Sequence, residues 1–148
     1  MDEIIVILVL LGIGYVFGVL AEKRHYKDIK KRERETVFLP VASFGAKQPL
    51  PDARDAMLFS GAVVISSDYF KTFVMTLRNL IGGRVIAYES LLDRGRREAL
   101  LRVKEQAIQW GAREILNVRY ETSTIGGGAS GRAGPVSIEV IAYGTGIR

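Results

Sequence analysis

The first apolar stretch of the chain, residues 4–21, reads IIVILVLLGIGYVFGVLA and contains no charged residue, proline, asparagine or glutamine. As a helix it would extend for about 27 Å, which is enough to cross the hydrocarbon core of a bilayer. A buried helix of a soluble protein is the alternative, but such helices seldom run this far without a polar face. The pattern therefore predicts a transmembrane helix over residues 4–21.

The pattern from residue 57 onward predicts first a strand and then two helices. Residues 57–65 are rich in β-branched side chains, which indicates a strand, and the Ser and Asp side chains at 66–68 offer N-cap oxygens for a helix that ends at the glycine pair 82–83. A longer helix is expected from about Ala87 to Trp110. Its apolar stripe consists of Leu92, Ala99, Val103, Ala107 and Trp110.

Two alternating segments complete the predicted domain. In residues 114–122 the apolar face would hold Leu116, Val118 and Tyr120, and residues 136–144 alternate in the same way. A period of two is typical of half-buried antiparallel strands. The expected fold class is therefore α+β. A single N-terminal transmembrane helix is followed by a small β-α-α-β-β domain over residues 57–148, with an antiparallel sheet covered by helices on one face.

Two segments join the predicted membrane helix to this domain. Residues 22–35 are basic, and we interpret them either as a helical continuation of the anchor or as a solvated tether. The i, i+4 spacing of Asp28 and Arg32 favours the helix. Residues 36–56 hold three of the four prolines, so no helix runs through them. We interpret them as a linker whose apolar piece, VFLPVASF, lies extended along the surface of the domain.

The distribution of charge predicts the orientation of the chain. The net charge is +5, and residues 22–34 alone hold seven basic and three acidic residues. By the positive-inside rule, residues 22–148 are then on the cytoplasmic side of the inner (cytoplasmic) membrane. The N-terminus would lie on the outer side of this membrane. A cleaved signal peptide would need a basic n-region and a small-x-small cleavage site, and neither is present. The basic segment suits anionic lipid head groups, whereas the lack of interleaved aromatic residues argues against nucleic acid.

The composition excludes several kinds of chemistry. The chain has no cysteine, and its single histidine, His25, lies in the basic segment, so disulfides, thiolate metal sites and a cysteine nucleophile are excluded. The polar residues 66–68 have no histidine partner in the domain, which excludes a hydrolase triad. The glycine-rich residues 126–131 lack the Lys-Ser/Thr ending of a phosphate loop and are interpreted as a hairpin loop. We therefore expect no enzymatic activity, no catalytic residue, no metal site and no cofactor.

The turn between the two predicted domain helices is the most distinctive cluster of candidate site residues. Its members are Arg78, Asn79, Gly82, Gly83, Arg84, Tyr88 and Glu89. The interpretation that we favour is a structural ion pair, within or between subunits, from Glu89 to Arg84 or Arg78. The functional interpretation is a pocket for an anionic ligand near the N-terminus of the second helix.

A second candidate contact lies inside the predicted membrane helix. Gly14 and Gly18 are four residues apart, so they share one helix face where backbones of neighbouring helices can approach closely. Glycine is also common in membrane helices for no such reason. A packing role and no role at all remain equally open.

Several pieces of the domain resemble the YbjQ-like family. They are SGAVVISSDYFKTF, LRNLIGGR followed by YES, a long helix ending in WGA, a strand ending in RYET and a last strand ending in Gly-Thr-Gly. The resemblance covers residues 57–148. It implies a dodecin-subunit-like α+β fold assembled as a ring, typically a pentamer, with no established enzymatic activity. Some members carry a heavy-metal-binding label, which a domain without Cys or His does not support.

Two functions of different class follow. The first is a membrane-anchored homo-oligomeric ring that acts as a scaffold or assembly platform at the cytoplasmic face, with copies of itself, anionic lipids and other membrane proteins as partners. The alternative is a binding module that holds an anionic small ligand or a hard cation between subunits. Three strands leave two sheet edges open, and a domain of about ninety residues buries only a modest fraction of its surface. We therefore expect an obligate ring with Arg84 and Glu89 near its seams.

Overall fold

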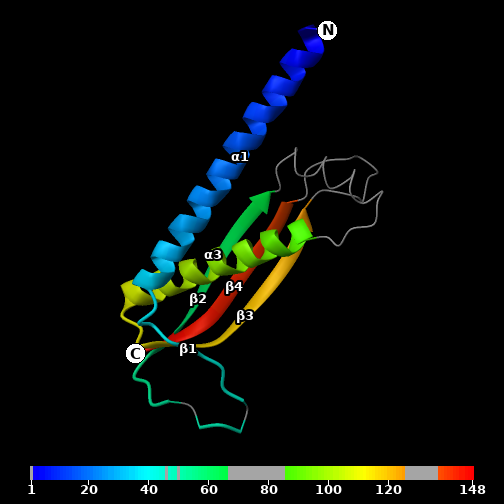
Figure 1. The fold of residues 1–148 in the computed structure, drawn as a ribbon. Coiled ribbons are helices and arrows are strands. Elements are labelled where there is room, and N and C mark those ends of the chain that lie inside the picture. The colour runs from blue at the N-terminus through cyan, green and yellow to red at the C-terminus, as the bar shows by residue number, and fades with distance from the viewer. Residues whose placement is uncertain (1, 46, 50, 67–85, 126–136) are drawn as a thin grey trace.

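The computed structural model describes residues 2–45, 47–49, 51–66, 86–125 and 137–148 (Figure 1). The described elements are α1 (Asp2–Glu35), β1 (Val41–Ala42), β2 (Ala56–Ser66), α3 (Ile86–Trp110), β3 (Glu114–Ile125) and β4 (Ser137–Ile147). The strands form one sheet in the order β1-β3-β4-β2, and α3 crosses one of its faces. This confirms the α+β class. The first predicted domain helix and the glycine-rich loop lie outside the described residues.

The sheet is mixed, whereas the sequence predicted an antiparallel one. β4 pairs antiparallel with both β2 and β3, as expected, but β1 pairs parallel with β3. β1 comes from the segment that was interpreted as a linker. A strand of two residues has no periodicity, so the hydrophobic pattern could not reveal it.

α3 begins and ends within one residue of its predicted bounds. Its apolar stripe is confirmed, because Ala99, Val103 and Ala107 are fully buried, and Leu92 and Trp110 are partly buried against the same core. The sheet contributes the alternate residues of β4 to this core, where every second side chain from Ile138 onward is buried. The core therefore lies between α3 and the two long strands β2 and β4.

Two glycines let α3 lie close to the sheet. A Cβ atom on Gly61 of β2 would lie 2.5 Å from the carbonyl oxygen of Ala99, and a Cβ atom on Gly95 of α3 would lie 2.7 Å from Cγ2 of Val140. Protein interiors are close-packed, and added methyl groups at such positions force neighbours apart. The spacing between α3 and the sheet thus depends on the absence of side chains at these two positions.

β3 contains an irregularity that the sequence pattern did not show. Asn117 has a positive φ of 53°, and the register with β4 shifts directly after Leu116. Leu116 lies opposite Thr145, on the face away from α3, whereas Tyr120 lies opposite the buried Ala142, on the face toward α3. A bulge inserts a residue and so moves the following side chains to the other face. The prediction that alternate residues of this strand share one face throughout is therefore wrong.

The segment after α1 is attached to the sheet. Leu39 is 1% exposed and belongs to the core cluster. The backbone N–H of Ile115 donates a hydrogen bond to the carbonyl oxygen of Pro40 at 3.0 Å, and that of Phe44 donates to Oδ1 of Asn117 at 2.8 Å. The expected extended conformation is therefore found only in part: residues 41–42 are a strand, whereas residues 37–39 form a turn and a bend that place Leu39 in the core.

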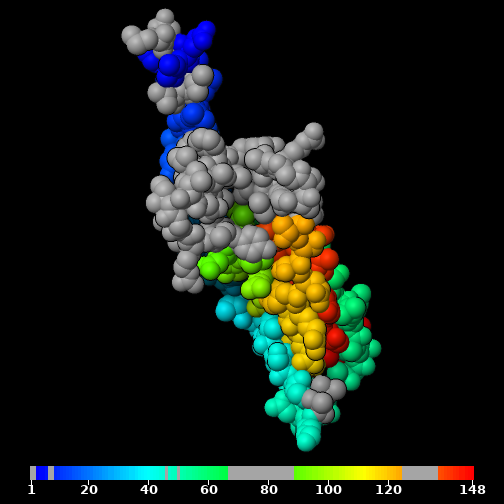
Figure 2. All heavy atoms as spheres, turned by 90° about the vertical axis from the view of Figure 1, so that its right-hand side faces the viewer, coloured from blue at the N-terminus to red at the C-terminus, as the bar shows by residue number. Residues whose placement is uncertain are grey.

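α1 is one continuous helix of 34 residues, so the helical interpretation of residues 22–35 is confirmed. In the described part of the chain it is the one helix long and apolar enough to span a membrane, by length and composition. Apart from the partly buried Val19, the large apolar side chains described between Ile4 and Leu20 are between 45% and 68% exposed. Figure 2 shows the N-terminal end of α1 projecting beyond the other coloured elements, and in Figure 1 the Ser66 end of β2 points the same way as the N-terminus of α1.

Candidate functional site

The C-terminal half of α1 is held against α3 by the side chain of Arg32. Its Nε and Nη2 atoms donate hydrogen bonds to the two carboxylate oxygens of Glu105 at 2.7 and 2.9 Å, and Nη1 donates to Oε2 of Glu98 at 2.8 Å. The side chains of Arg32 and Glu98 are only 22% and 6% exposed. Hydrogen bonding to Glu105 raises the pKa of Arg32 above its ordinary value, against the opposing effect of burial. The planar guanidinium suits this arrangement because its donors form a rigid fork.

A second ion pair lies beside the first, and here the arginine is on α3 and the carboxylate is on α1. Arg97 of α3 donates from Nε and Nη2 to the two carboxylate oxygens of Glu33 at 2.7 and 2.6 Å. These hydrogen bonds lower the pKa of Glu33, although burial acts in the other direction. The Tyr26 hydroxyl donates to the carbonyl oxygen of Ser90 at 3.3 Å, and Ile29 between them is fully buried. We call this set of contacts the α1–α3 clasp: Tyr26, Ile29, Arg32 and Glu33 of α1 with Ser90, Arg97, Glu98 and Glu105 of α3.

Sequence reasoning missed the clasp because its partners lie between 64 and 73 residues apart. The spacing of Asp28 and Arg32 favoured a helix. In the structure Nη1 of Arg32 lies 3.7 Å from Oδ2 of Asp28, farther than from the carboxylate oxygen of Glu98. An i, i+4 pair can be read from one segment, whereas a contact between two helices depends on how they pack.

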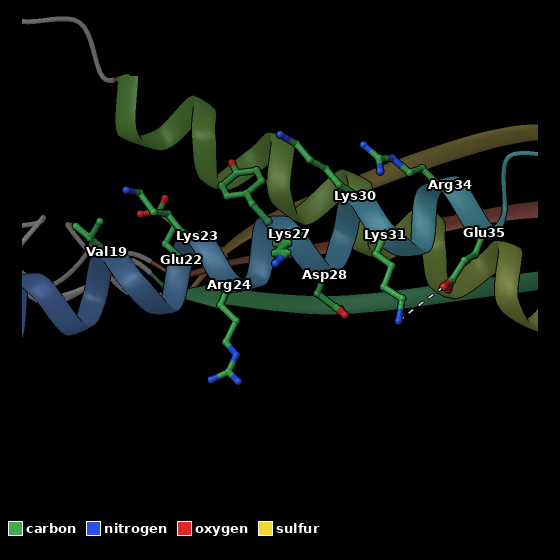
Figure 3. Close-up of a pocket in the computed structure, with 11 residues that line it drawn as sticks. Val19, Glu22, Lys23, Arg24, Lys27, Asp28, Lys30, Lys31, Arg34 and Glu35 are labelled. Atoms are coloured by element: carbon green, nitrogen blue, oxygen red, sulfur yellow. Dashed lines mark ion pairs between the residues drawn. The ribbon is translucent and has the colours of Figure 1, made fainter.

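A basic surface occupies the rest of α1 just beyond its apolar part (Figure 3). Its cations are Lys23, Arg24, Lys27, Lys30, Lys31 and Arg34, all of them exposed. Lys31 lies 3.8 Å from the carboxylate of Glu35, and Arg24 points away from the rest of the chain in Figure 3. A surface in which one sign of charge dominates attracts anionic groups.

Most of the predicted turn lies where the structure gives no description. Arg78, Asn79, Gly82, Gly83 and Arg84 are outside the described residues. Tyr88 and Glu89 belong to the start of α3; the side chain of Glu89 is exposed, and that of Tyr88 is not described. The ion pair between Glu89 and an arginine of the turn therefore stays a prediction.

The two glycines of the apolar helix lie in α1 as expected. A Cβ atom on Gly14 would meet no other atom within 4 Å. The described part of the chain thus places nothing against Gly14. Whether Gly14 and Gly18 pack against a neighbouring helix or have no such role stays open.

Potential metal ligands do not gather in the described part of the chain. No group of three or more His, Cys, Asp or Glu side chains within the described ranges could hold a metal ion. The imidazole of His25 has a buried Nδ1 atom without a hydrogen-bond partner among the described residues. A single imidazole supplies one ligand, whereas zinc sites need three or four.

Comparison with known proteins gives matches over the domain. A family model described as "Putative heavy-metal-binding" matches residues 54–148. A "UPF0145 protein" from Natronomonas pharaonis is 44% identical over 73 residues, which are 49% of this chain and 62% of that protein. Another from Clostridium novyi is 35% identical over 91 residues, which are 62% of this chain and 81% of that protein.

A solved structure is also similar to part of the chain. It is the crystal structure of a protein of unknown function from Pediococcus pentosaceus, which belongs to the DUF74 family. The likeness covers 74% of this chain and 95% of the other, at 16% identity and a TM-score of 0.43. The family assignment rests on the sequence matches, since the family model spans more than half of the chain. By these matches the chain is a member of the YbjQ-like family, with α1 and the segment up to Ala53 outside the part that the family model covers.

Proposed function

We propose that the protein is a single-pass membrane protein whose domain forms a homo-oligomeric ring at the cytoplasmic face and serves there as a scaffold or assembly platform. The observation that carries this proposal is the two-part character of α1. Its first half exposes a continuous apolar surface, and its second half is bonded to the domain through the α1–α3 clasp. Exposed apolar surface costs roughly 25 cal/mol per Å² in water, and a bilayer removes that cost.

The basic surface supports the orientation and a lipid partner. Lys23, Arg24 and Lys27 lie within two turns of the end of the apolar stretch and are exposed. Basic residues at this position favour the cytoplasmic side, and each contributes about 1 kcal/mol near an anionic membrane surface. Because the clasp ties the same helix to α3, the domain would sit at a fixed height, with the Ser66 end of β2 toward the bilayer (Figure 1).

The outer face of the sheet supports self-assembly. β2 is an edge strand of the described sheet and has no charged residue, although natural edge strands are commonly protected by charge or proline. On the face away from α3 it exposes Leu58 and Val64, at 65% and 56%. Side chains of α3 donate hydrogen bonds to the carbonyl oxygens of Ser60 and Ala62, so the edge is partly capped. The apolar face is therefore the surface that we assign to a second copy.

The family description names heavy metals, and the side chains of this chain do not fit them. The chain has no cysteine, and His25 lies on α1, outside the matched residues 54–148. The remaining charged donors are carboxylates, which prefer hard cations. We propose no metal-dependent role. The alternative function, a ligand held between subunits by the turn at 78–89, stays a prediction because that turn is mostly outside the described residues.

Native mass spectrometry of the full chain, released from detergent micelles, tests this proposal. We expect a single species at a multiple of the 16.4 kDa subunit mass. A ring mass with one additional small molecule per subunit would favour the alternative binding module. A chain that stays monomeric at micromolar concentration would contradict the ring.

A further inference from the structure

A pocket of about 320 Å³ lies where the end of α1, α3 and β3 meet. It is lined by Glu33, Thr36, Val37, Arg96, Arg97, Leu100, Leu101, Lys104 and Tyr120. None of these residues belongs to the predicted turn at 78–89. The volume is at the lower end of the range for small-molecule sites, which suits a ligand of a few heavy atoms.

Two cations of the pocket, Arg96 and Lys104, have donors that a ligand could use. Arg97 is already bonded through two hydrogen bonds to Glu33, the one carboxylate in the lining. Arg96 is exposed and has no ion-pair partner among the described residues. Lys104 donates one hydrogen bond, to the carbonyl oxygen of Thr36 at 3.3 Å, and an ammonium group has three donors. Burial lowers the pKa of Lys104 more than the nearby charge of Glu33 raises it, and this carboxylate is itself bonded to Arg97.

Tyr120 adds a neutral donor on the opposite wall. The register shift after Leu116 places Tyr120 opposite Ala142, on the face of β3 that is turned toward α3. Burial raises the pKa of its hydroxyl, against the effect of the nearby Arg96 charge, so the hydroxyl stays protonated at neutral pH. No hydrogen bond from this hydroxyl is formed to another residue in the described part of the chain. It can therefore donate to a ligand.

The remaining lining is apolar. Leu101 is 2% exposed and forms the floor, Leu100 is partly buried beside it, and Val37 is 75% exposed at the rim. A bare inorganic ion would leave this wall in contact with water. A ligand with a charged head and a short hydrocarbon part would satisfy both the donors and the wall.

We propose that this pocket binds a small organic carboxylate, whose anionic head meets Arg96, Lys104 and Tyr120 while its short apolar tail lies on Leu100 and Leu101. The pocket lies at the C-terminal end of α1, at the far end of this helix from its exposed apolar part, so the ligand is a soluble metabolite-sized anion and not a lipid head group. This inference is independent of whether the chain forms a ring.

Ligand-observed NMR on the full chain in detergent micelles tests the inference, with acetate, butyrate and inorganic phosphate as probes. We expect saturable binding of butyrate, weaker binding of acetate because it lacks the tail, and weaker binding of phosphate. In Arg96→Gln, butyrate affinity should fall by about tenfold or more, the loss expected for one hydrogen bond to a charged group. Lys104→Met should have a similar effect.

Arg119→Gln is the matched control. Arg119 is an exposed arginine that directly precedes Tyr120 in β3. It lies opposite Tyr143, and therefore on the face of the sheet away from the pocket. It should leave butyrate affinity unchanged, and its circular dichroism spectrum and that of Arg96→Gln should match the unmodified chain. The inference is overturned if butyrate does not bind saturably, if Arg96→Gln and Arg119→Gln bind it equally well, or if phosphate binds more tightly than butyrate.

Discussion

At Arg32 one guanidinium bonds to two carboxylates of α3, of which Glu98 is 6% exposed. If Arg32 is replaced by alanine, Glu98 keeps only Arg102, at 3.1 Å, as a partner in the described part of the chain. Removing one partner of a buried ion pair costs about 3 kcal/mol when the remaining charge is left uncompensated, and here Arg102 offsets part of that cost. We expect Arg32→Ala to lower the opening free energy of the α1–α3 clasp by roughly 2–3 kcal/mol. Amide hydrogen exchange of residues 26–35 would measure this loss.

Lys31→Ala is the control for this experiment. Lys31 is the neighbour of Arg32, and its 3.8 Å pair with Glu35 is exposed on both sides. Exposed i, i+4 pairs contribute about 0.3–0.5 kcal/mol. Equal changes in exchange for the two variants would contradict the role given to Arg32.

Glu33 makes the clasp sensitive to acid. Its pKa is lowered by the hydrogen bonds from Arg97, so the folded state holds its proton less tightly than the unfolded state does. The resulting stability is present above the unfolded pKa, at about 4.5, and is lost as the pH falls through the folded pKa. Glu33→Gln should remove this part of the pH dependence. The unfolding free energies of the two chains, compared between pH 6 and pH 3, would converge on acidification; parallel curves would refute this.

At the scale of single residues, the sequence indicated ion pairs between residues close in the chain and missed those between distant residues. Asp28 and Arg32 could be paired from their spacing alone, whereas Glu98 and Glu105 are 66 and 73 residues from Arg32. The polar character of residues 22–35 indicated solvent exposure, because charged side chains are seldom buried unless they are paired. Here Arg32 and Glu33 are partly buried because α3 supplies their partners. The pocket at Tyr120 was missed for the same reason, since its lining comes from α1, α3 and β3.

At the scale of the elements, the contact between α3 and β2 depends on Gly61. A Cβ atom there would lie 2.5 Å from a backbone oxygen of α3, which cannot move without moving the helix. Overpacking of this kind typically costs 1–3 kcal/mol, so we expect Gly61→Ala to lower the unfolding free energy by about 2 kcal/mol. Chemical denaturation followed through the fluorescence of Trp110, which packs against the same core, would report it.

Gly12→Ala serves as the comparison, because a Cβ atom at Gly12 would meet no other atom within 4 Å. Alanine also has a higher helix propensity than glycine, so this variant should not lose stability. The packing argument fails if Gly61→Ala is as stable as Gly12→Ala.

Long, strongly periodic elements were predictable from the sequence, and short or irregular ones were not. α3 and β4 follow their hydrophobic patterns closely because one face of each is buried, and in β2 the buried residues alternate from Phe59 onward. β1 has two residues and no pattern, and β3 changes face at Asn117. That change of face carries Tyr120 to the α3 side and so creates a wall of the pocket.

At the scale of the whole molecule, the α1–α3 clasp fixes residues 22–35 to the domain. These residues are therefore part of one continuous helix and are not a flexible tether. α1 is continuous from its exposed apolar half to the residues that bond to α3. A membrane-embedded first half would then fix the height and the direction of the domain relative to the bilayer. In the ring that we propose, every copy would then have the same orientation, and the basic surfaces would lie together at the lipid head groups.

The central claim is that α1 crosses the membrane with the domain on the cytoplasmic side, and cysteine accessibility in spheroplasts tests it most directly. The chain has no cysteine, so single substitutions at the exposed positions Glu3 and Asp52 can be labelled without background. With a membrane-impermeant maleimide, Glu3→Cys should react in intact spheroplasts, whereas Asp52→Cys should react only after the membrane is permeabilised. Labelling of Asp52→Cys in intact spheroplasts, or recovery of the unlabelled chain in the soluble fraction, would contradict the account.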